Sequence, residues 1–177
     1  TLEKANIDNR ALAVAIDGAL SEALDVNLRL TNLAMIVPAL PGPLTAEARV
    51  QTPLDAPSLT GSISTTSGIR VLLDGQVPGA DGAIQANAQG QAPLALASAF
   101  LANRVLTGNA GFDLTLQGQP SLANVRGTIQ AENARLFDPS TNLEIAPLSM
   151  TAHLSGGVAA LQVQGSVNAG KLQADGT

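Results

Sequence analysis

The sequence predicts an all-β protein built from an elongated, mostly antiparallel sheet. Three observations carry this prediction. Aliphatic residues recur at every second position of many short segments, polar residues fill the positions between them, and glycine and proline separate one segment from the next. A strand patterned in this way has one dry face and one wet face, which is typical of antiparallel sheets.

The alternation predicts about a dozen short strands. Their apolar positions fall, in chain order, within residues 12–16, 24–30, 44–50, 59–63, 69–73, 84–88, 112–116, 125–131, 143–145, 148–154, 161–167 and 172–174. Hairpin turns are predicted where glycine can supply a positive φ, at Asp17-Gly18, Asp74-Gly75, Asp81-Gly82, Gly156-Gly157 and Asp175-Gly176. Breaks between strands are predicted at Pro53, Pro57, Pro120, Pro139 and Pro147, where a missing N–H costs no ladder bond.

Two segments depart from the alternation. In residues 92–106, Leu94, Ala97, Leu101 and Val105 have helical spacing after Pro93, which predicts a short amphipathic helix. In residues 31–42, around Ala34, a proline at position 38 limits any helix to about one or two turns.

These two segments also begin a repeat. A strand of the form apolar-x-Gly-Ser/Thr-Ile follows each of them, and the two copies place Gly61 and Gly127 at an offset of 66 residues, which also relates Gly42 to Gly108. We therefore predict repeat units of several strands each, at about 31–96 and 97–162. Because stacked units make a long object, we expect the chain to be an excerpt of a longer repetitive protein.

The composition argues against catalysis and against nucleic acid binding. The formal net charge is −5, cysteine is absent, and the only histidine is His153. His153 shares the polar side of its strand with serine and threonine, so we interpret it as a solvated surface residue, and Ser155 has no nucleophile-elbow pattern around it. Glu132, Asp138 and Glu144 form no recognisable catalytic pair. We predict that the protein is not an enzyme and uses no cofactor or metal.

The apolar face is the feature left to interpret. It is lined by Ala, Leu, Val and Ile, and the whole chain contains three Phe, no Trp and no Tyr. Alternation does not show what covers such a face, so a sealed sandwich or solenoid core and an open groove both remain possible. A groove lined by small aliphatic side chains suits acyl chains, because each CH₂ exposed to water costs about 0.8 kcal/mol. It could equally hold a polypeptide strand by edge pairing.

Several stretches of the chain resemble the TamB family, the inner-membrane component of the translocation and assembly module of Gram-negative bacteria, a family with AsmA-like relatives. The resemblance is carried by LTGNAGFDLTLQGQPSLANVRGTIQAENARLFDP, which ends in Arg135-Leu136-Phe137-Asp138-Pro139, and by LEIAPLSMTAHLSGG and LQVQGSVNAGKLQADG further on. The upstream LTNLAMIVPALPGPLTAEARVQTPLDAPSLTGSI fits the same style.

The resemblance implies a curved, taco-shaped β-sheet with a hydrophobic groove, located in the periplasm, in a full-length protein anchored in the inner membrane. It implies support of phospholipid transport to the outer membrane, or of outer-membrane protein assembly, with TamA, a BamA-like outer-membrane protein, as partner. Acyl chains or unfolded outer-membrane polypeptide would be the cargo. The groove-lining positions that it suggests are Leu28, Val50, Ile63, Val71, Ile84, Phe112, Leu114, Leu116, Val125, Ile129, Ile145, Met150, Leu154, Val163 and Val167.

Two further interpretations compete with lipid transport. The first is a chaperone-like docking surface for unfolded β-strands. The second is a purely structural β-solenoid stalk, which would have a sealed core and no ligand.

Overall fold

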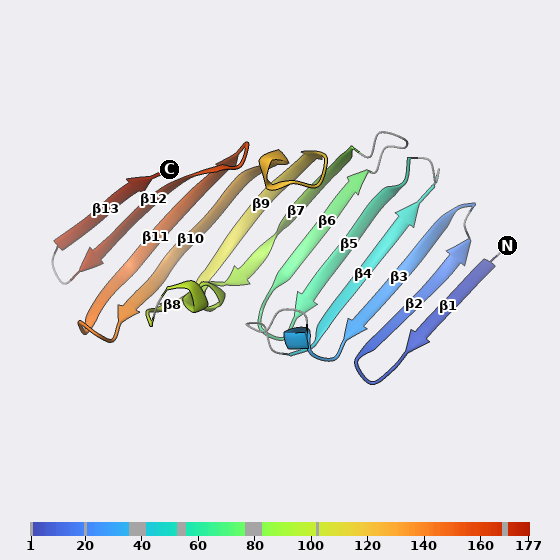
Figure 1. The fold of residues 1–177 in the computed structure, drawn as a ribbon, viewed down its shortest axis with the longest axis horizontal. Coiled ribbons are helices and arrows are strands. Elements are labelled where there is room, and N and C mark those ends of the chain that lie inside the picture. Colours follow the sequence, from blue (N-terminus) through green and yellow to red (C-terminus); the bar gives the residue numbers. More distant parts are fainter. Residues whose placement is uncertain are drawn as a thin grey trace.

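The computed structural model describes residues 2–19, 21–35, 42–52, 56–76, 83–101, 103–167 and 170–177. Within these residues, 13 strands form one open, curved antiparallel sheet, and sequence neighbours pair along almost its whole length (Figure 1). The two ends of the chain lie at opposite ends of the sheet (Figure 1). The all-β, antiparallel prediction is confirmed.

The strands follow one another as a meander. They are β1 (Leu2–Asp8), β2 (Leu12–Ala19), β3 (Ala23–Leu30), β4 (Leu44–Gln51), β5 (Ser58–Thr65), β6 (Arg70–Gln76), β7 (Ile84–Pro93), β8 (Val105–Thr107), β9 (Asn109–Gly118), β10 (Val125–Asp138), β11 (Leu143–Ser155), β12 (Val158–Val167) and β13 (Gly170–Gly176). β8 lies off this path, because β9 takes its place beside β7 and β8 pairs with the far end of β10. The described residues also form three 3₁₀ helices: η1 (Leu33–Met35), η2 (Leu94–Phe100) and η3 (Leu122–Asn124).

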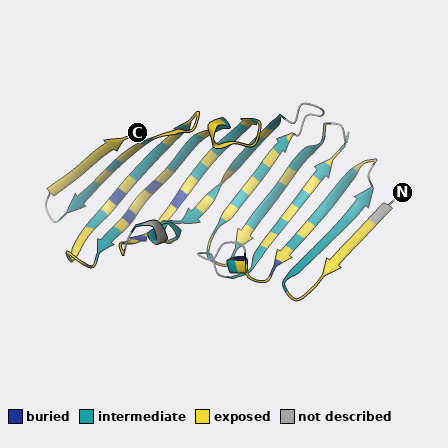
Figure 2. Ribbon diagram, viewed as in Figure 1, coloured by how far each residue is buried: buried dark blue, intermediate teal, exposed yellow. Residues whose placement is uncertain are grey.

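The sheet is a single layer over most of its length. Its accessible surface is 11273 Å², whereas a compact protein of 17.8 kDa exposes about 8,000 Å². The buried residues of the described chain are few, and most of them gather on β9, β10 and β11 (Figure 2). The alternation of apolar and polar residues therefore gives a sheet with one apolar and one polar face, and within the described residues no second sheet packs on it.

Several local predictions were wrong. Three predicted hairpin turns are parts of strands instead: Asp17-Gly18 lies inside β2, Asp74-Gly75 inside β6, and Asp175-Gly176 at the end of β13. Their glycines occupy positions on the apolar side of these strands. The turn at Gly156-Gly157 is confirmed. The pair 81–82 lies outside the described residues, as do Pro53 and the proline at position 38.

Pro147 also lies inside a strand. The segments predicted at 143–145 and 148–154 join into β11, and Pro147 stands where the register with β10 shifts between the pairs Ala134–Leu148 and Leu136–Ile145. At such an irregularity a residue without an N–H costs no ladder bond, which is why the proline is tolerated there. The strands β1 and β8 were not predicted.

The predicted helix at 92–106 is shorter and tighter than its spacing indicated. η2 spans Leu94–Phe100, while Ala92 and Pro93 end β7, and Val105 and Leu106 belong to β8. A segment this short has little helical stability of its own. Its conformation is held by tertiary hydrogen bonds, such as the one that the backbone N–H of Leu106 donates to Ser98 Oγ at 3.0 Å. In residues 31–42 the structure describes only η1 and the two flanking stretches, because 36–41 lie outside the described residues.

Candidate functional site: the apolar face

One face of the sheet is apolar across nearly every strand. Register pairing links residues of successive strands into rows that cross the sheet, and two adjacent rows contain only aliphatic residues, Phe112 and glycine between β1 and β12. The first row is Ala5, Ile16, Val26, Ala48, Gly61, Leu73, Ala88, Leu114, Gly127, Leu154 and Ala159. The second is Ile7, Val14, Leu28, Ala46, Ile63, Val71, Gly90, Phe112, Ile129, Ala152 and Leu161.

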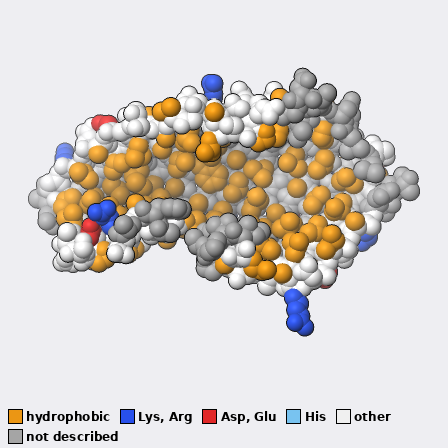
Figure 3. Space-filling view, viewed as in Figure 1, with side chains coloured by type: hydrophobic (Ala, Val, Ile, Leu, Met, Phe, Trp, Pro, Cys, Tyr) orange, Lys and Arg blue, Asp and Glu red, His pale blue; other side chains and the backbone are white. Residues whose placement is uncertain are grey.

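We call the surface formed by these two rows and the same-side residues of the flanking rows the apolar face. Strands about 4.8 Å apart carry it over roughly 50 Å from β1 to β12. Figure 3 shows this surface as a continuous hydrophobic area, with the visible charged side chains at its rims. Most of its side chains are partly exposed, because only their neighbours within the sheet shield them.

The structure brings all the predicted lining residues to the apolar face. Seven of them belong to the two rows: Leu28, Ile63, Val71, Phe112 and Ile129 in the second, and Leu114 and Leu154 in the first. Val50, Leu116, Val125 and Ile84 lie on the same side towards the edge that carries η3, and Met150, Val163, Ile145 and Val167 lie on it towards the opposite edge. Their contact with a ligand stays a prediction.

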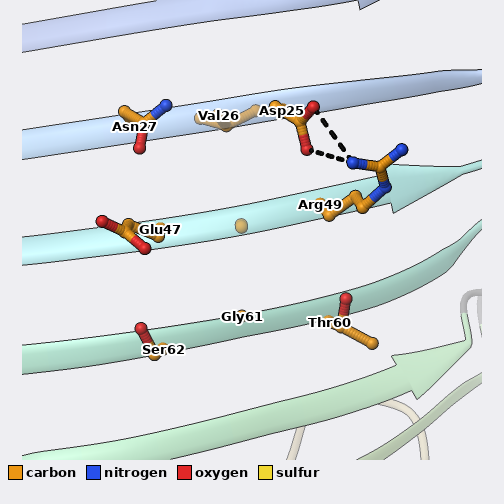
Figure 4. A pocket seen from close by; sticks show the side chains of 9 residues that line it. Asp25, Val26, Asn27, Glu47, Arg49, Thr60, Gly61 and Ser62 are labelled. Atoms are coloured by element: carbon orange, nitrogen blue, oxygen red, sulfur yellow. Dashed lines mark hydrogen bonds and ion pairs between the residues drawn. The ribbon is translucent and has the colours of Figure 1, made fainter.

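The opposite face is polar and held by cross-strand pairs. Figure 4 shows Asp25 and Arg49 joined across β3 and β4, where Arg49 Nη1 donates to both carboxylate oxygens at 3.1 and 3.2 Å. Asn27, Glu47 and Ser62 line the same shallow depression of about 380 Å³. These groups are solvated, and the described residues hold no cluster of His, Cys, Asp or Glu that could bind a metal.

His153 belongs to this polar face. Its ring nitrogen Nδ1 lies 3.2 Å from Thr128 Oγ1 on β10, and its side chain is exposed. This is the surface position predicted for it.

The connection from β7 to β9 covers one part of the apolar face. Leu106 of β8, Ala134 of β10 and Leu148 of β11 form a buried cluster in which Ala134 is 1% exposed. Leu94 and Ala97 of η2 and Leu101, which follows η2, pack against it. The three positions predicted from helical spacing thus do face the sheet, whereas Val105 is exposed.

A pocket of about 420 Å³ lies beside this cluster. It is bounded by Leu101, Leu106, Leu136, Leu143, Ile145, Leu148, Met150, Val163 and Leu172, together with Arg104 and Asp138. We call it the covered pocket. Nine of its eleven lining residues are apolar.

Arg104 and Asp138 place two charges at the mouth of the covered pocket. The pairs Val105–Phe137 and Leu106–Leu136 put Asp138 on the same side as Leu136, and Arg104 Nε donates to Asp138 Oδ2 at 3.0 Å. Hydrogen bonds from the side chains of Ser140 and Arg104 lower the pKa of Asp138 from 3.8 to about 2. Asp138 is therefore ionised throughout the physiological pH range.

Sequence reasoning missed this pair because the alternation changes phase within β10. The register shifts between Ala131 and Ala134, and Asn133 there has a φ of 53°, so residues beyond it exchange faces. Two consecutive polar residues, Glu132 and Asn133, interrupt the alternation at that place and are the signal that could have indicated a bulge.

The fold and its two faces define a class of protein: a single-layer antiparallel meander with one apolar face and one polar face. No protein-family model, curated protein or solved structure matches the chain. Among the described residues there is also no helix with the length and apolarity needed to cross a membrane.

Proposed function

We propose that the apolar face is the floor of a hydrophobic groove that shelters acyl chains, in a periplasmic protein of the TamB type that supports phospholipid transport to the outer membrane. The observation that carries this proposal is the pair of adjacent rows without a polar side chain from β1 to β12. An acyl chain lying along these rows would be removed from water, which stabilises the bound state by about 0.8 kcal/mol for each CH₂ buried.

The absence of a second layer over these rows in the described residues favours a carrier over a stalk. A structural stalk would use its aliphatic residues to fill a sealed core, and the large accessible surface of this chain is not that of a filled core. An exposed apolar surface of this extent is typical of a binding surface.

Leu114 is the best position at which to test the proposal. It lies in the middle of the first row between Ala88 and Gly127, and it is only half-buried. Because both neighbours are small, an aspartate at this position keeps access to water, and we expect Leu114→Asp to fold while blocking passage of acyl chains. Val163→Asp, opposite Met150, repeats the test on β12, close to the C-terminal end of the sheet.

The experiment places a photo-crosslinking residue at Leu114 in cells that make the complete protein, with Gln117 on the polar face of the same strand as the matched position. Phospholipid adducts at Leu114 and none at Gln117 are the expected result, and Leu114→Asp should abolish adducts formed from a neighbouring crosslinking position, Ile129. Adducts to unfolded outer-membrane polypeptide instead of lipid would support the chaperone-like function. Adducts that persist unchanged in Leu114→Asp would overturn the lipid proposal.

A further inference from the structure

The covered pocket differs from the rest of the apolar face because it combines enclosure with fixed charge. Its volume of about 420 Å³ falls within the range of roughly 300–1,000 Å³ typical of small-molecule sites. Nine aliphatic or methionine side chains bound it, and two of them, Leu143 and Leu172, are 40% and 37% exposed although they are large and apolar. An apolar guest in the pocket would remove this exposed surface from water.

The charges at the mouth are of both signs and lie side by side. Asp138 accepts from Arg104 Nε through Oδ2, while its Oδ1 accepts from both the backbone N–H of Ser140 at 2.9 Å and the Ser140 hydroxyl. The carboxylate is ionised and its side chain is 16% exposed, so its charge can attract the ammonium group of a ligand. The Arg104 side chain is 51% exposed and pairs with Asp138 through Nε, so among the described residues its terminal nitrogens make no hydrogen bond and can donate to a ligand.

We propose that the covered pocket binds the end of a zwitterionic, phospholipid-like amphiphile, with the hydrocarbon chain in the pocket, the phosphate on Arg104 and the ammonium group beside Asp138. A guanidinium binds phosphate through paired N–H donors, and the carboxylate attracts the ammonium group. A purely anionic head group would gain the contact with Arg104 and be repelled by Asp138. This inference rests on the proposed function, to which it adds a fixed head-group site and a preference among lipids.

The ion pair on the polar face provides a matched control. Arg49 and Asp25 have the same chemistry as Arg104 and Asp138, with a closest approach of 3.1 Å, and the Arg49 side chain is 52% exposed. The depression around Arg49 is lined mostly by polar residues, in contrast to the covered pocket beside Arg104. Arg49→Gln therefore removes an equivalent charge without touching the covered pocket.

The two methionines make the binding measurable residue by residue. Met150 lines the covered pocket, whereas Met35 lies in η1 and is 65% exposed. With ¹³C-methyl methionine the 177-residue chain therefore gives two methyl signals, one in the site and one outside it. The probes are dodecylphosphocholine, dodecyl maltoside and laurate, each below its critical micelle concentration, because they combine similar tails with zwitterionic, neutral and anionic heads.

We expect dodecylphosphocholine to shift Met150 and leave Met35 in place, with an affinity about tenfold higher than that of dodecyl maltoside, as one charge-assisted contact predicts. Laurate should bind more weakly than dodecylphosphocholine. Arg104→Gln should abolish the preference for the zwitterion, and Arg49→Gln should retain it.

Equal affinity for the three probes, or a preference that survives Arg104→Gln, overturns the head-group site while leaving the lipid-carrying proposal standing. A shift of Met35 equal to that of Met150 shows unselective coating of the surface and also overturns the site. If no probe shifts Met150, and crosslinks at Leu114 also fail to capture lipid, then the proposed function fails together with the site.

Discussion

The short connection from β3 to β4 and the long connection from β7 to β9 share a closing hydrogen bond but differ in what the chain forms between its two ends. Each leaves the sheet at the same long edge (Figure 1), and each is closed by a leucine N–H that donates to a glycine carbonyl, Leu33 to Gly42 at 2.7 Å and Leu94 to Gly108 at 2.9 Å. The closing glycines are 66 residues apart. The leucines are 61 apart, so the segment from the leucine to the closing glycine is five residues longer in the long connection.

Those additional residues change what the connection does to the apolar face. In the long connection the chain returns as β8, which pairs with β10, and Ser98 binds the backbone of Leu106. A buried cluster and the covered pocket follow from that pairing. In the long connection the returning strand β8 builds a buried cluster and a pocket on the apolar face, whereas the described residues of the short connection form only η1, in which Leu33 is 8% exposed.

Of the substitutions that test the difference between the two connections, Leu148→Ala is expected to lower the free energy of unfolding most. The Leu148 side chain is 2% exposed beneath the long connection, whereas Leu28, opposite Ala46, is half-buried on the apolar face. Leu148→Ala should lower the free energy of unfolding by about 2–5 kcal/mol, since a buried leucine leaves a cavity. Leu28→Ala should cost no more than about 1.5 kcal/mol. Urea unfolding of both variants measures this, and equal losses would show that the long connection covers nothing.

A smaller effect is expected at the two closing glycines. Gly42 and Gly108 have φ values of 104° and 117°, so an alanine is strained at either position, by about 1–3 kcal/mol. A Cβ at Gly42 would come within 2.6 Å of Thr66 Oγ1, the end of an exposed side chain, while a Cβ at Gly108 would meet the backbone of Ala134 at 3.2 Å. Adding Thr66→Ala should therefore relieve part of the loss in Gly42→Ala.

The same added substitution should do nothing for Gly108→Ala, whose obstacle is backbone. Thermal unfolding of the two single variants and the two doubles makes the comparison. Relief of both losses to the same extent would mean that Thr66→Ala stabilises the chain in general, and the local clash argument would be wrong.

Sequence patterning predicted the sheet well and the long connection poorly, for physical reasons. Alternation reports which side of a strand is dry, so residues such as Leu28 and Leu114 were placed on the correct face. It does not report where a loop returns. β8 has only three residues, and it exists because Leu106 meets Leu136, a contact between distant parts of the chain.

The offset of 66 residues is visible in the structure as equivalent places. Gly61 and Gly127 stand in the same row of the apolar face, and β4 and β9 follow the closing glycines. The boundary predicted at about residues 96 and 97 falls inside η2. The division into two units at about 31–96 and 97–162 stays a prediction.

The smallest effect expected concerns the ion pair that distinguishes the long connection. The pKa of Asp138 is lowered from 3.8 to about 2, first by the Ser140 side chain and next by Arg104. Because the folded state holds the ionised form, the pair stabilises the fold fully above about pH 3.8, and this contribution is lost as the pH falls through about 2. The contribution is small, since the pair is open to solvent.

The order of these causes can be tested by following the Asp138 carboxyl carbon by NMR as the pH is lowered. Ser140→Ala should raise the pKa of Asp138 more than Arg104→Gln does, and Arg49→Gln should leave it unchanged. If Arg104→Gln had the larger effect, the cross-strand ion pair would be the main source of the low pKa. The end of β8 would then be fastened to β10 by charge more than by the local turn at Ser140, and lowering the pH would release the long connection while leaving the short one closed.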